Sequence, residues 1–518
     1  MSRHSIELSV NDNLPVKDIN DHDPNSIGVP VSEQGVPTPY SQFTKIEKRL
    51  IVALITFAAT FSPLSSFIFF PAINALSSSL QVSVEKINLT VTSYMIVAGI
   101  APAVIGDMAD TSGRRVAYLT TVGIYCAANV GLAVQNNWTA LFLLRMLQSA
   151  GGAATIAMGY GVVSDIATPS ERGGFVGQLL LGPNFATAIG PLLGGVLAAK
   201  PGWRWIFGVL AIASGTCVLL IALLLPETSR SIVGNGSKGV TGLRTAFILH
   251  LITGKKRKTP TATENSHTAG LDRGASRRCS RIPNPLASLK MLLASDTILI
   301  TLIYGINYTN FSCLQASLST LAIDIYRVSQ LQAGLIYLPF GIGSCVGAYL
   351  SGPIMNHDYR VVARHCGITI DAVRGDDMTS FPIERSRFRT IWFHLGVTAI
   401  GTAGYGWSLQ LKTHISVPLV IQFIIGATLA ITFNFCGTLL VDIHPKSPAA
   451  AQAANNIVRC SLAGVGLAVL DLILRHLGVG WTFTLLAGLT AACLGIAWLE
   501  WRYGQAWRES LRAKGIER

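Results

Sequence analysis

Twelve long apolar runs fill most of this 518-residue chain, and one basic polar stretch, from about residue 228 to residue 296, divides them into two groups of six. The hydrocarbon core of a bilayer is about 30 Å thick, and about 20 apolar residues in a helix cross it. Each run has close to that length. Because twelve spans leave little chain for a soluble domain, we predict a protein that works inside a bilayer, and therefore a transporter.

The predicted fold is an all-α membrane protein with twelve transmembrane helices. We expect a disordered cytosolic tail over residues 1–44, a first six-helix bundle over 45–228, a basic linker loop over 229–296, a second six-helix bundle over 297–500 and a C-terminal tail over 501–518. The expected spans are 50–75, 87–106, 116–135, 140–163, 174–199, 205–226, 297–321, 332–355, 390–409, 415–440, 449–474 and 481–500.

Composition limits the function classes. The chain is 50% hydrophobic but only 13% charged, whereas soluble domains carry about 25% charged residues. A net charge of +13 could suggest nucleic acid, but the basic residues lie in loops between apolar runs. We therefore expect a small-molecule substrate, contact with membrane lipid, no nucleic-acid partner and a monomer. The sequence contains no metal-ligand spacing, no Gly-x4-Gly-Lys-Ser/Thr loop and no catalytic cluster, so we expect no metal, no other cofactor and no enzyme.

Lysine and arginine are distributed unevenly between the two sides of the predicted membrane. With the N-terminus placed inside, thirty basic residues flank the spans on the inside and six on the outside. Such a bias indicates cytosolic loops. We expect a multi-pass plasma-membrane protein with both termini and the linker in the cytosol. Asn137 begins an Asn-Trp-Thr glycosylation sequence, but it lies almost at the membrane surface, whereas such acceptors normally need an exposed loop.

The loop after the second run has the pattern Gly-x3-Asp-x2-Gly-Arg-Arg, formed by Gly106, Asp110, Gly113, Arg114 and Arg115. Asp110 can pair with either arginine, and the glycines permit a tight turn between two helices. A charged latch of this kind can hold a gate in one of two arrangements, as transport requires. A plain tight turn with solvated charges is the alternative.

The fifth run contains a Gly-Pro-x2-Gly-Gly core, formed by Gly190, Pro191, Gly194 and Gly195. Small residues let helices approach closely, and a proline weakens a membrane helix locally. These properties suit a second gating element. Close packing without functional meaning is the alternative.

Two arginines lie inside the predicted spans. Arg145 shares a helix face with Gln148 in the fourth run, and Arg459 shares one with Asn455 in the eleventh. A charge in a span costs several kcal/mol unless it faces protein or water, which predicts a cavity. The alternatives are snorkelling of Arg145 toward the outer surface and an interhelix partner for Arg459.

Amide side chains extend the candidate binding site. Asn307, Asn310 and Gln315 lie in the seventh run and Asn434 in the tenth. Membrane amides contact substrates, but they also join helices to one another. No Asp or Glu lies as deep as the two arginines, so the predicted cavity suits an anion or a neutral polar molecule, because guanidinium binds carboxylates.

These motifs together resemble the major facilitator superfamily, and within it the fungal drug:proton antiporter group with twelve spans. A looser resemblance is to the citrate-exporter branch. Thr111 departs from the usual basic residue of the loop motif, and Ala186 from a usual glycine. Further matches are Asp165, Glu171–Gly173, Trp203–Phe207 and Leu225–Thr228.

The resemblance implies two pseudo-symmetric bundles with a central substrate site and alternating access. It also implies proton antiport, although the residues themselves do not reveal a proton site and facilitated export is the alternative. We predict export of a small organic compound: a secondary metabolite, a drug-like compound or an organic anion. The alternatives are a citrate-like di- or tricarboxylate exporter and a transporter-like sensor.

Overall fold

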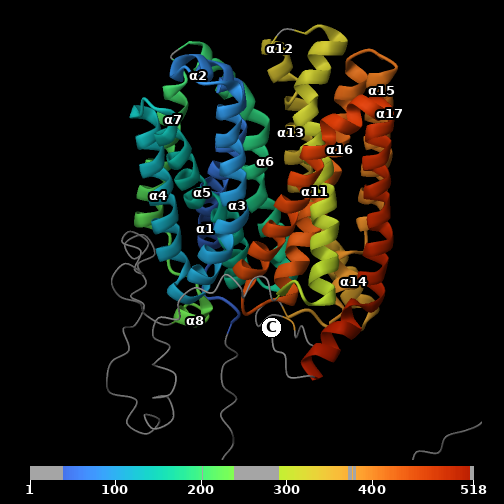
Figure 1. Cartoon of the computed structure of the whole chain (residues 1–518). Coiled ribbons are helices and arrows are strands. Elements are labelled where there is room, and N and C mark those ends of the chain that lie inside the picture. The colour runs from blue at the N-terminus through green and yellow to red at the C-terminus, as the bar shows by residue number, and fades with distance from the viewer. Residues whose placement is uncertain are drawn as a thin grey trace, which may run out of the picture. The chain divides into compact units, whose positions relative to one another are not determined.

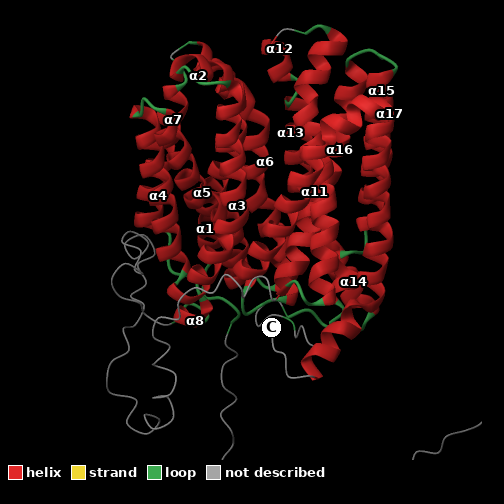
Figure 2. Ribbon diagram, viewed as in Figure 1, coloured by secondary structure: helices red, strands yellow, loops and turns green. Residues whose placement is uncertain are grey.

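The computed structural model describes residues 39–200, 202–237, 291–328, 330–371, 376 and 381–513. These residues form helices joined mostly by short loops (Figure 2), and no strand occurs among them. Most of the predicted tail and most of the predicted linker lie outside the described residues.

The first half of the chain supplies the six long helices that the sequence predicts. α1 begins after Thr44, which forms a capping box with Glu47 and so satisfies backbone N–H groups at the helix start. α3 ends at Ser112 because Gly113 has a φ of 109°, which favours glycine. The elements are α1 (Lys45–Phe67), η1 (Phe70–Ala72), α2 (Ile73–Leu80), α3 (Val84–Ser112), α4 (Arg114–Val134), α5 (Trp138–Ile166), α6 (Pro169–Ala199), α7 (Arg204–Leu224) and α8 (Arg230–Val233).

The described residues of the second half form five long helices, one of which consists of two arms. Gly478 has a φ of 74° and a ψ of 172°, which breaks α17 into a first arm before it and a second arm after it. The elements are α11 (Ser295–Tyr326), α12 (Gln330–Leu335), α13 (Leu338–His365), α14 (Ile383–Arg387), α15 (Ile391–Gln410), α16 (Ser416–Ile443) and α17 (Pro448–Ala513).

By length and apolarity, 10 helices of the described residues could cross a membrane. Twelve spans were predicted, and two features account for the difference. α17 contains two predicted spans in one helical element. α15 has 20 residues, but polar side chains such as His394 and Gln410 lower its apolarity. It still packs against both α16 and α17.

The eighth predicted span began too early. The prediction placed its start at residue 332, whereas α13 begins at Leu338. The preceding residues form the separate helix α12. Pro339 lies in the first turn of α13, where a residue without an N–H group is tolerated and so favours the start of a new helix.

The long helices form two bundles, one from each half of the chain (Figure 1). Between them α3 packs on α17, and α6 packs on α13. α3 and α13 are the second spans of their halves, while α6 and the first arm of α17 are the fifth. Each of the two contacts therefore joins the second span of one half to the fifth span of the other half. This equivalence is the pseudo-symmetry of a parallel repeat.

Loops lie at two ends of the bundles. α8, α14 and the end of α17 lie at one end, which we call the basic end, and α2 and α12 lie at the opposite end (Figure 1). Large apolar side chains are exposed along the helices between these ends, for example Ile212 at 67%, Ile400 at 76% and Val465 at 65%. So much exposed apolar surface fits lipid.

Candidate functional site

Arg145 in α5 is enclosed by side chains of the first bundle. Its guanidinium lies 4.3 Å from the ring centroids of both Phe69 and Tyr94. Its Nη1 donates to Gln148 Oε1 at 2.6 Å, and Gln148 Nε2 donates to Asn129 Oδ1 at 2.7 Å. Arg145 is 1% exposed. The cation–π contacts and hydrogen bonds offset the cost of burying the charge, so this geometry disfavours the predicted substrate contact of Arg145 and Gln148.

Arg459 in the first arm of α17 has a different environment. Its Nε donates to Asn456 Oδ1 at 2.7 Å, and its guanidinium lies 4.7 Å from the ring centroid of Tyr308 and 6.0 Å from that of Tyr304. The residue is partly exposed. No carboxylate of the described residues forms an ion pair with it. Its guanidinium therefore keeps N–H groups with which it can bind an anion.

The surroundings of Arg459 lie where the two bundles meet. Asn456 Nδ2 donates to Ala98 O of α3 at 2.5 Å. Phe311 of α11 lies edge-on to Phe67 of α1, with ring centroids 6.4 Å apart. Substrate sites of transporters with this architecture lie at the same interface, which makes the Arg459 region the candidate site.

Aromatic side chains surround the guanidinium. Tyr304 stacks on Phe433, with ring centroids 4.6 Å apart, and Tyr308 lies 5.5 Å from Phe311. All four are partly exposed. Tyr160 of α5 is 3% exposed, and its Oη has no hydrogen-bond partner within the described ranges. The sequence analysis overlooked these tyrosines, although the spacing of Tyr304 and Tyr308, four apart in an apolar run, could have indicated them.

Three of the predicted amides contact helices within the second bundle. Asn307 Nδ2 donates to a carbonyl of its own helix at 2.8 Å. Asn310 Nδ2 donates to Thr402 Oγ1 of α15 at 2.9 Å. Asn434 Nδ2 donates to Ser351 Oγ of α13 at 2.5 Å. For Asn310 and Asn434 the geometry favours the alternative of interhelix contact over substrate contact.

The other two amides are Gln315 and Asn455. They are 6% and 3% exposed, and the side-chain oxygen of each has no hydrogen-bond partner in the part of the chain that the structure describes. Asn455 precedes Arg459 by one helical turn, so the two share a helix face. Asn455 therefore belongs to the Arg459 region, whereas the contacts of Gln315 do not connect it to that region.

The loop motif forms a compact charge network at the basic end. Arg114 Nη1 pairs with Asp110 Oδ1 at 2.6 Å, and Arg114 Nε pairs with Asp165 Oδ2 at 3.1 Å. Gly106 lies so close to the backbone of Ala449 that an added Cβ would be 3.1 Å from its carbonyl oxygen. Ala449 belongs to α17, so the motif lies against the second bundle. The geometry is that of paired charges, not that of a turn with solvated ones.

Arg115 forms a different set of contacts, within the first bundle. Glu227 Oε1 accepts the backbone N–H of Arg114 at 2.8 Å, and Glu227 Oε2 accepts that of Arg115 at 3.3 Å. The Arg115 guanidinium donates to Ile221 O at 2.9 Å, near the end of α7, where carbonyls lack helical partners. Gly113 precedes both arginines, and a side chain there would overlap Glu227. Of the two arginines, Arg114 pairs with Asp110.

A buried ion network joins the two bundles at the basic end. Arg172 at the start of α6 pairs with Asp442 at the end of α16. Arg387 of α14 pairs with the other carboxylate oxygen of Asp442 at 2.8 Å and donates to Pro169 O at 2.7 Å. We call Arg172, Asp442 and Arg387 the latch. The sequence analysis did not predict it, because 270 positions separate Arg172 from Asp442.

α14 is held in place by the end of α17. Arg508 Nε pairs with Glu384 Oε1 at 3.0 Å, and Arg508 Nη2 donates to Phe381 O at 2.8 Å. Burial raises the pKa of the Glu384 carboxyl above its ordinary value, while the Arg508 charge acts in the opposite direction. These contacts position Arg387 for the latch.

The small residues of α6 pack against α1. A side chain at Gly194 would overlap the carbonyl of Ile68, and one at Gly190 would press on Phe67. Pro191 lies inside the helix, and Gly195 faces Pro71 at ordinary contact distance. The contact lies within the first bundle. The predicted gating role of these residues stays a prediction, since close packing alone accounts for the contact.

Asn137 is exposed, and its Oδ1 accepts the backbone N–H of Ala140 at 2.7 Å. It therefore caps α5, and its glycosylation stays a prediction. The structure contains no group of three or more metal-ligating side chains among the residues that it describes.

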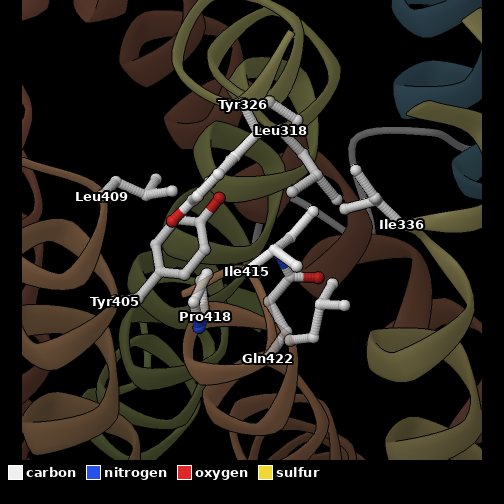
Figure 3. Close-up of a pocket in the computed structure, with 10 residues that line it drawn as sticks. Leu318, Tyr326, Ile336, Tyr405, Leu409, Ile415, Pro418 and Gln422 are labelled. Atoms are coloured by element: carbon white, nitrogen blue, oxygen red, sulfur yellow. The ribbon is translucent and has the colours of Figure 1, made fainter. Parts of the chain in front are cut away.

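Two pockets of the second bundle lie apart from Arg459. One, of about 10 Å³, is lined by Tyr405 and Gln422 among apolar side chains (Figure 3). The other, of about 300 Å³, is lined by apolar and small residues of α11 and of both arms of α17, including Cys313 and Leu489. Neither is lined by a charged side chain or by a residue of the first bundle, so neither provides the predicted polar site between the halves.

The paired bundles and the polar region between them define a multi-pass membrane transporter. The sequence profile of the Major Facilitator Superfamily matches residues 55–467. The chain belongs to that superfamily and is a secondary transporter of small organic compounds.

Two fungal relatives are similar over most of the chain. MFS-type transporter phiD of Fungal sp. (strain ATCC 74256) is 35% identical over 493 residues, which cover 94% of this chain and 73% of the relative. Citrate exporter 1 of Aspergillus niger is 36% identical over 481 residues, which cover 91% of this chain and 89% of the relative. These similarities identify the chain as a fungal member of the superfamily.

Solved structures share the fold at low identity. The proton:xylose symporter XylE has a TM-score of 0.64 and 13% identity, with 89% of this chain and 96% of that chain covered. The human organic anion transporter MFSD10 (TETRAN) has a TM-score of 0.59 and 13% identity, with 87% and 99% covered. At this identity they establish the fold alone.

Proposed function

We propose that this protein exports an organic anion from the cytosol by alternating access, and that Arg459 binds the anion. The observation that carries the proposal is the environment of Arg459, which is partly exposed, lies near the contact between the bundles and has no ion pair to a described carboxylate. A charge at that depth is costly without a partner. An anionic substrate would supply the partner, because a guanidinium binds a carboxylate through two parallel hydrogen bonds.

The latch supports the mechanism. If the basic end faces the cytosol, as the distribution of Lys and Arg predicts, Arg172, Asp442 and Arg387 hold the cytosolic side closed. Alternating access requires contacts at one end to break while contacts at the other form. The substrate then enters from the cytosol when these ion pairs separate, and it leaves on the other side after they have formed again. The network of Asp110, Arg114 and the start of α17 would work in parallel.

The location and the driving force are part of the same proposal. The protein lies in the plasma membrane with both termini in the cytosol, and a proton gradient drives export. An epitope tag at each terminus, stained in intact and in permeabilised cells, tests the orientation. Proteoliposomes with an imposed pH gradient test the coupling, and equal transport with and without the gradient would mean facilitated export.

Export of a citrate-like tricarboxylate is the second candidate, favoured by the 36% identity to Citrate exporter 1. Secondary metabolites and drug-like compounds fall within the first candidate when they carry an acidic group. Both candidates use Arg459, so they differ in the number of carboxylates and not in the binding residue.

Metabolite profiling tests the proposed function. Culture medium and cell extract would be compared for a deletion strain and for strains that carry the wild-type protein, Arg459→Gln or Arg475→Gln. Arg475 is the control, because it forms an exposed ion pair with Asp471 on the same helical element. We expect an acidic compound to disappear from the medium of the deletion and Arg459→Gln strains and to accumulate in their cells. Wild-type export by Arg459→Gln would refute the anion-binding role.

A further inference from the structure

Resting on the proposed function, we propose that the transported anion is a flat aromatic compound with a single carboxylate, and not a citrate-like tricarboxylate. The inference follows from the charges available where the bundles meet, from the aromatic side chains around Arg459 and from polar atoms left without partners nearby.

One accessible cation limits the number of carboxylates. Arg145 is enclosed between two aromatic rings, and Arg172 is buried in the latch, where it shares the carboxylate of Asp442 with Arg387. Arg114 is paired with two carboxylates. Among the arginines that the structure describes between the bundle ends, Arg459 is left to bind an anion. A tricarboxylate would bring two further negative charges into a low-dielectric region without partners, which is costly.

The aromatic side chains around Arg459 suit a flat ring. Four partly exposed rings lie next to one another in this region. The ring centroids are 4.6 Å apart for Tyr304 and Phe433, 5.5 Å for Tyr308 and Phe311, and 6.2 Å for Tyr308 and Phe433. Aromatic faces and edges favour another ring by about 0.5–1.5 kcal/mol beyond simple burial. A compact, strongly hydrated ion such as citrate has only two methylene groups and no flat apolar face to place against these rings.

Two unpaired polar atoms point to a further substituent on the ring. Tyr160 Oη and Asn455 Oδ1 are buried and have no hydrogen-bond partner among the described residues. Tyr160 reaches from the first bundle to Gly437 of the second, where an added Cβ would overlap its hydroxyl. A buried hydroxyl without a partner is costly, and a phenol or hydroxyl group of the substrate would satisfy it.

Binding of three probes to the purified full-length protein in lipid nanodiscs tests the inference. The probes are 6-hydroxy-2-naphthoate, its uncharged amide 6-hydroxy-2-naphthamide, and citrate, each titrated by isothermal calorimetry at neutral pH. We expect the naphthoate to bind, the amide to bind at least about ten-fold more weakly, and citrate to show no saturable binding at the same concentrations. The ten-fold difference corresponds to one charge-assisted hydrogen bond.

Variants assign the binding to named residues. Arg459→Gln should weaken naphthoate binding about 30-fold or more, because it removes the charged partner. Tyr308→Leu should weaken it about 3-fold to 10-fold, because it removes a ring contact. Arg475→Gln is the matched control and should leave binding unchanged. Arg459→Lys keeps the charge, so recovery of part of the affinity would show that Arg459→Gln acts on binding and not on folding.

The outcomes separate this inference from the proposed function. Arg459-dependent binding of citrate that is tighter than that of naphthoate would overturn the aromatic monocarboxylate and leave the anion exporter in place. Absence of naphthoate binding also overturns the inference. Equal binding of naphthoate and its amide, unaffected by Arg459→Gln, would overturn both, because the site would then bind the ring without its charge.

Discussion

The two arginines within the spans belong to regions of opposite character. Arg145 lies among side chains of its own bundle and is 1% exposed. Arg459 lies where the bundles meet, is partly exposed and contacts rings without an acidic partner. The cost of a charge in a membrane is the same in kind for both. The comparison shows that the arrangement of partners, and not the presence of the charge, separates a structural arginine from a candidate ligand-binding one.

Replacing each arginine by methionine is the strongest test of the different roles of Arg145 and Arg459. We expect Arg459→Met to lower transport of 6-hydroxy-2-naphthoate into proteoliposomes about 100-fold, because loss of a charged partner costs about 3 kcal/mol. Its thermal unfolding should change less than that of Arg145→Met, because its ring contacts, at 4.7 and 6.0 Å, are longer than the two of Arg145. Arg145→Met should transport within about three-fold of wild type but unfold at lower temperature, because two cation–π contacts of about 0.5–2 kcal/mol each are lost.

Both variants are measured by the same two methods, initial transport rate and thermal unfolding followed by tryptophan fluorescence. The comparison fails if the effects are exchanged. It also fails if Arg145→Met abolishes transport while its unfolding temperature equals that of wild type, since Arg145 would then act on the substrate.

The latch provides a third environment, in which arginines are buried but paired. Asp442→Asn should destabilise the closed basic end by about 1.5–3 kcal/mol, because Arg172 and Arg387 lose the charge of their shared acceptor. Hydrogen exchange of backbone amides between residues 444 and 453 should accelerate by at least about ten-fold. Asp471→Asn, which alters an exposed pair, should leave this segment unchanged. Identical exchange in both variants would mean that the latch does not hold the bundles together.

Local sequence patterns predicted the helices and the fold. They did not predict the contacts between side chains that are far apart in the sequence. Runs of apolar residues revealed the spans because hydrophobicity acts over one helix at a time. The two rings that enclose the Arg145 guanidinium come from different segments: Phe69 lies between α1 and η1, and Tyr94 lies in α3. Arg172 and Asp442 meet across 270 positions. A single sequence gives no sign of which distant side chains will meet, so the sequence pointed to Arg459 and Asn455 of the candidate site but not to its tyrosines.

Gly113 extends the comparison to the stability of the first bundle, whose side chains enclose Arg145. Gly113→Ala should lower stability by about 1–3 kcal/mol, because its φ of 109° is strained for other residues and a side chain would overlap Glu227. The unfolding temperature measures the effect. Gly123→Ala is the control inside α4, the helix that Gly113 precedes, where an added Cβ meets nothing within 4 Å. It should stabilise by about 0.5–1 kcal/mol, and equal loss in both variants would remove the role assigned to Gly113.

Replacing Tyr40 should have the smallest effect on the latch, because Tyr40 is not one of its three residues and contacts it only through Arg172. Its Oη donates to Ser164 O at 3.0 Å and accepts from Arg172 Nη2 at 3.2 Å. Its ring lies 3.6 Å from the Arg230 guanidinium. Tyr40→Phe keeps the ring contact with Arg230 and removes the hydrogen bonds to Ser164 and Arg172, so it tests how these two bonds hold the segment before α1 at the basic end.

We expect Tyr40→Phe to weaken the closed arrangement by about 1 kcal/mol, which corresponds to about five-fold faster hydrogen exchange between residues 444 and 453. Tyr349→Phe is the control, because Tyr349 is 64% exposed. The double variant Tyr40→Phe/Asp442→Asn should exchange no faster than Asp442→Asn alone, since Tyr40 acts through the Arg172–Asp442 pair. Additive effects in the double variant would show that Tyr40 stabilises the basic end by another route.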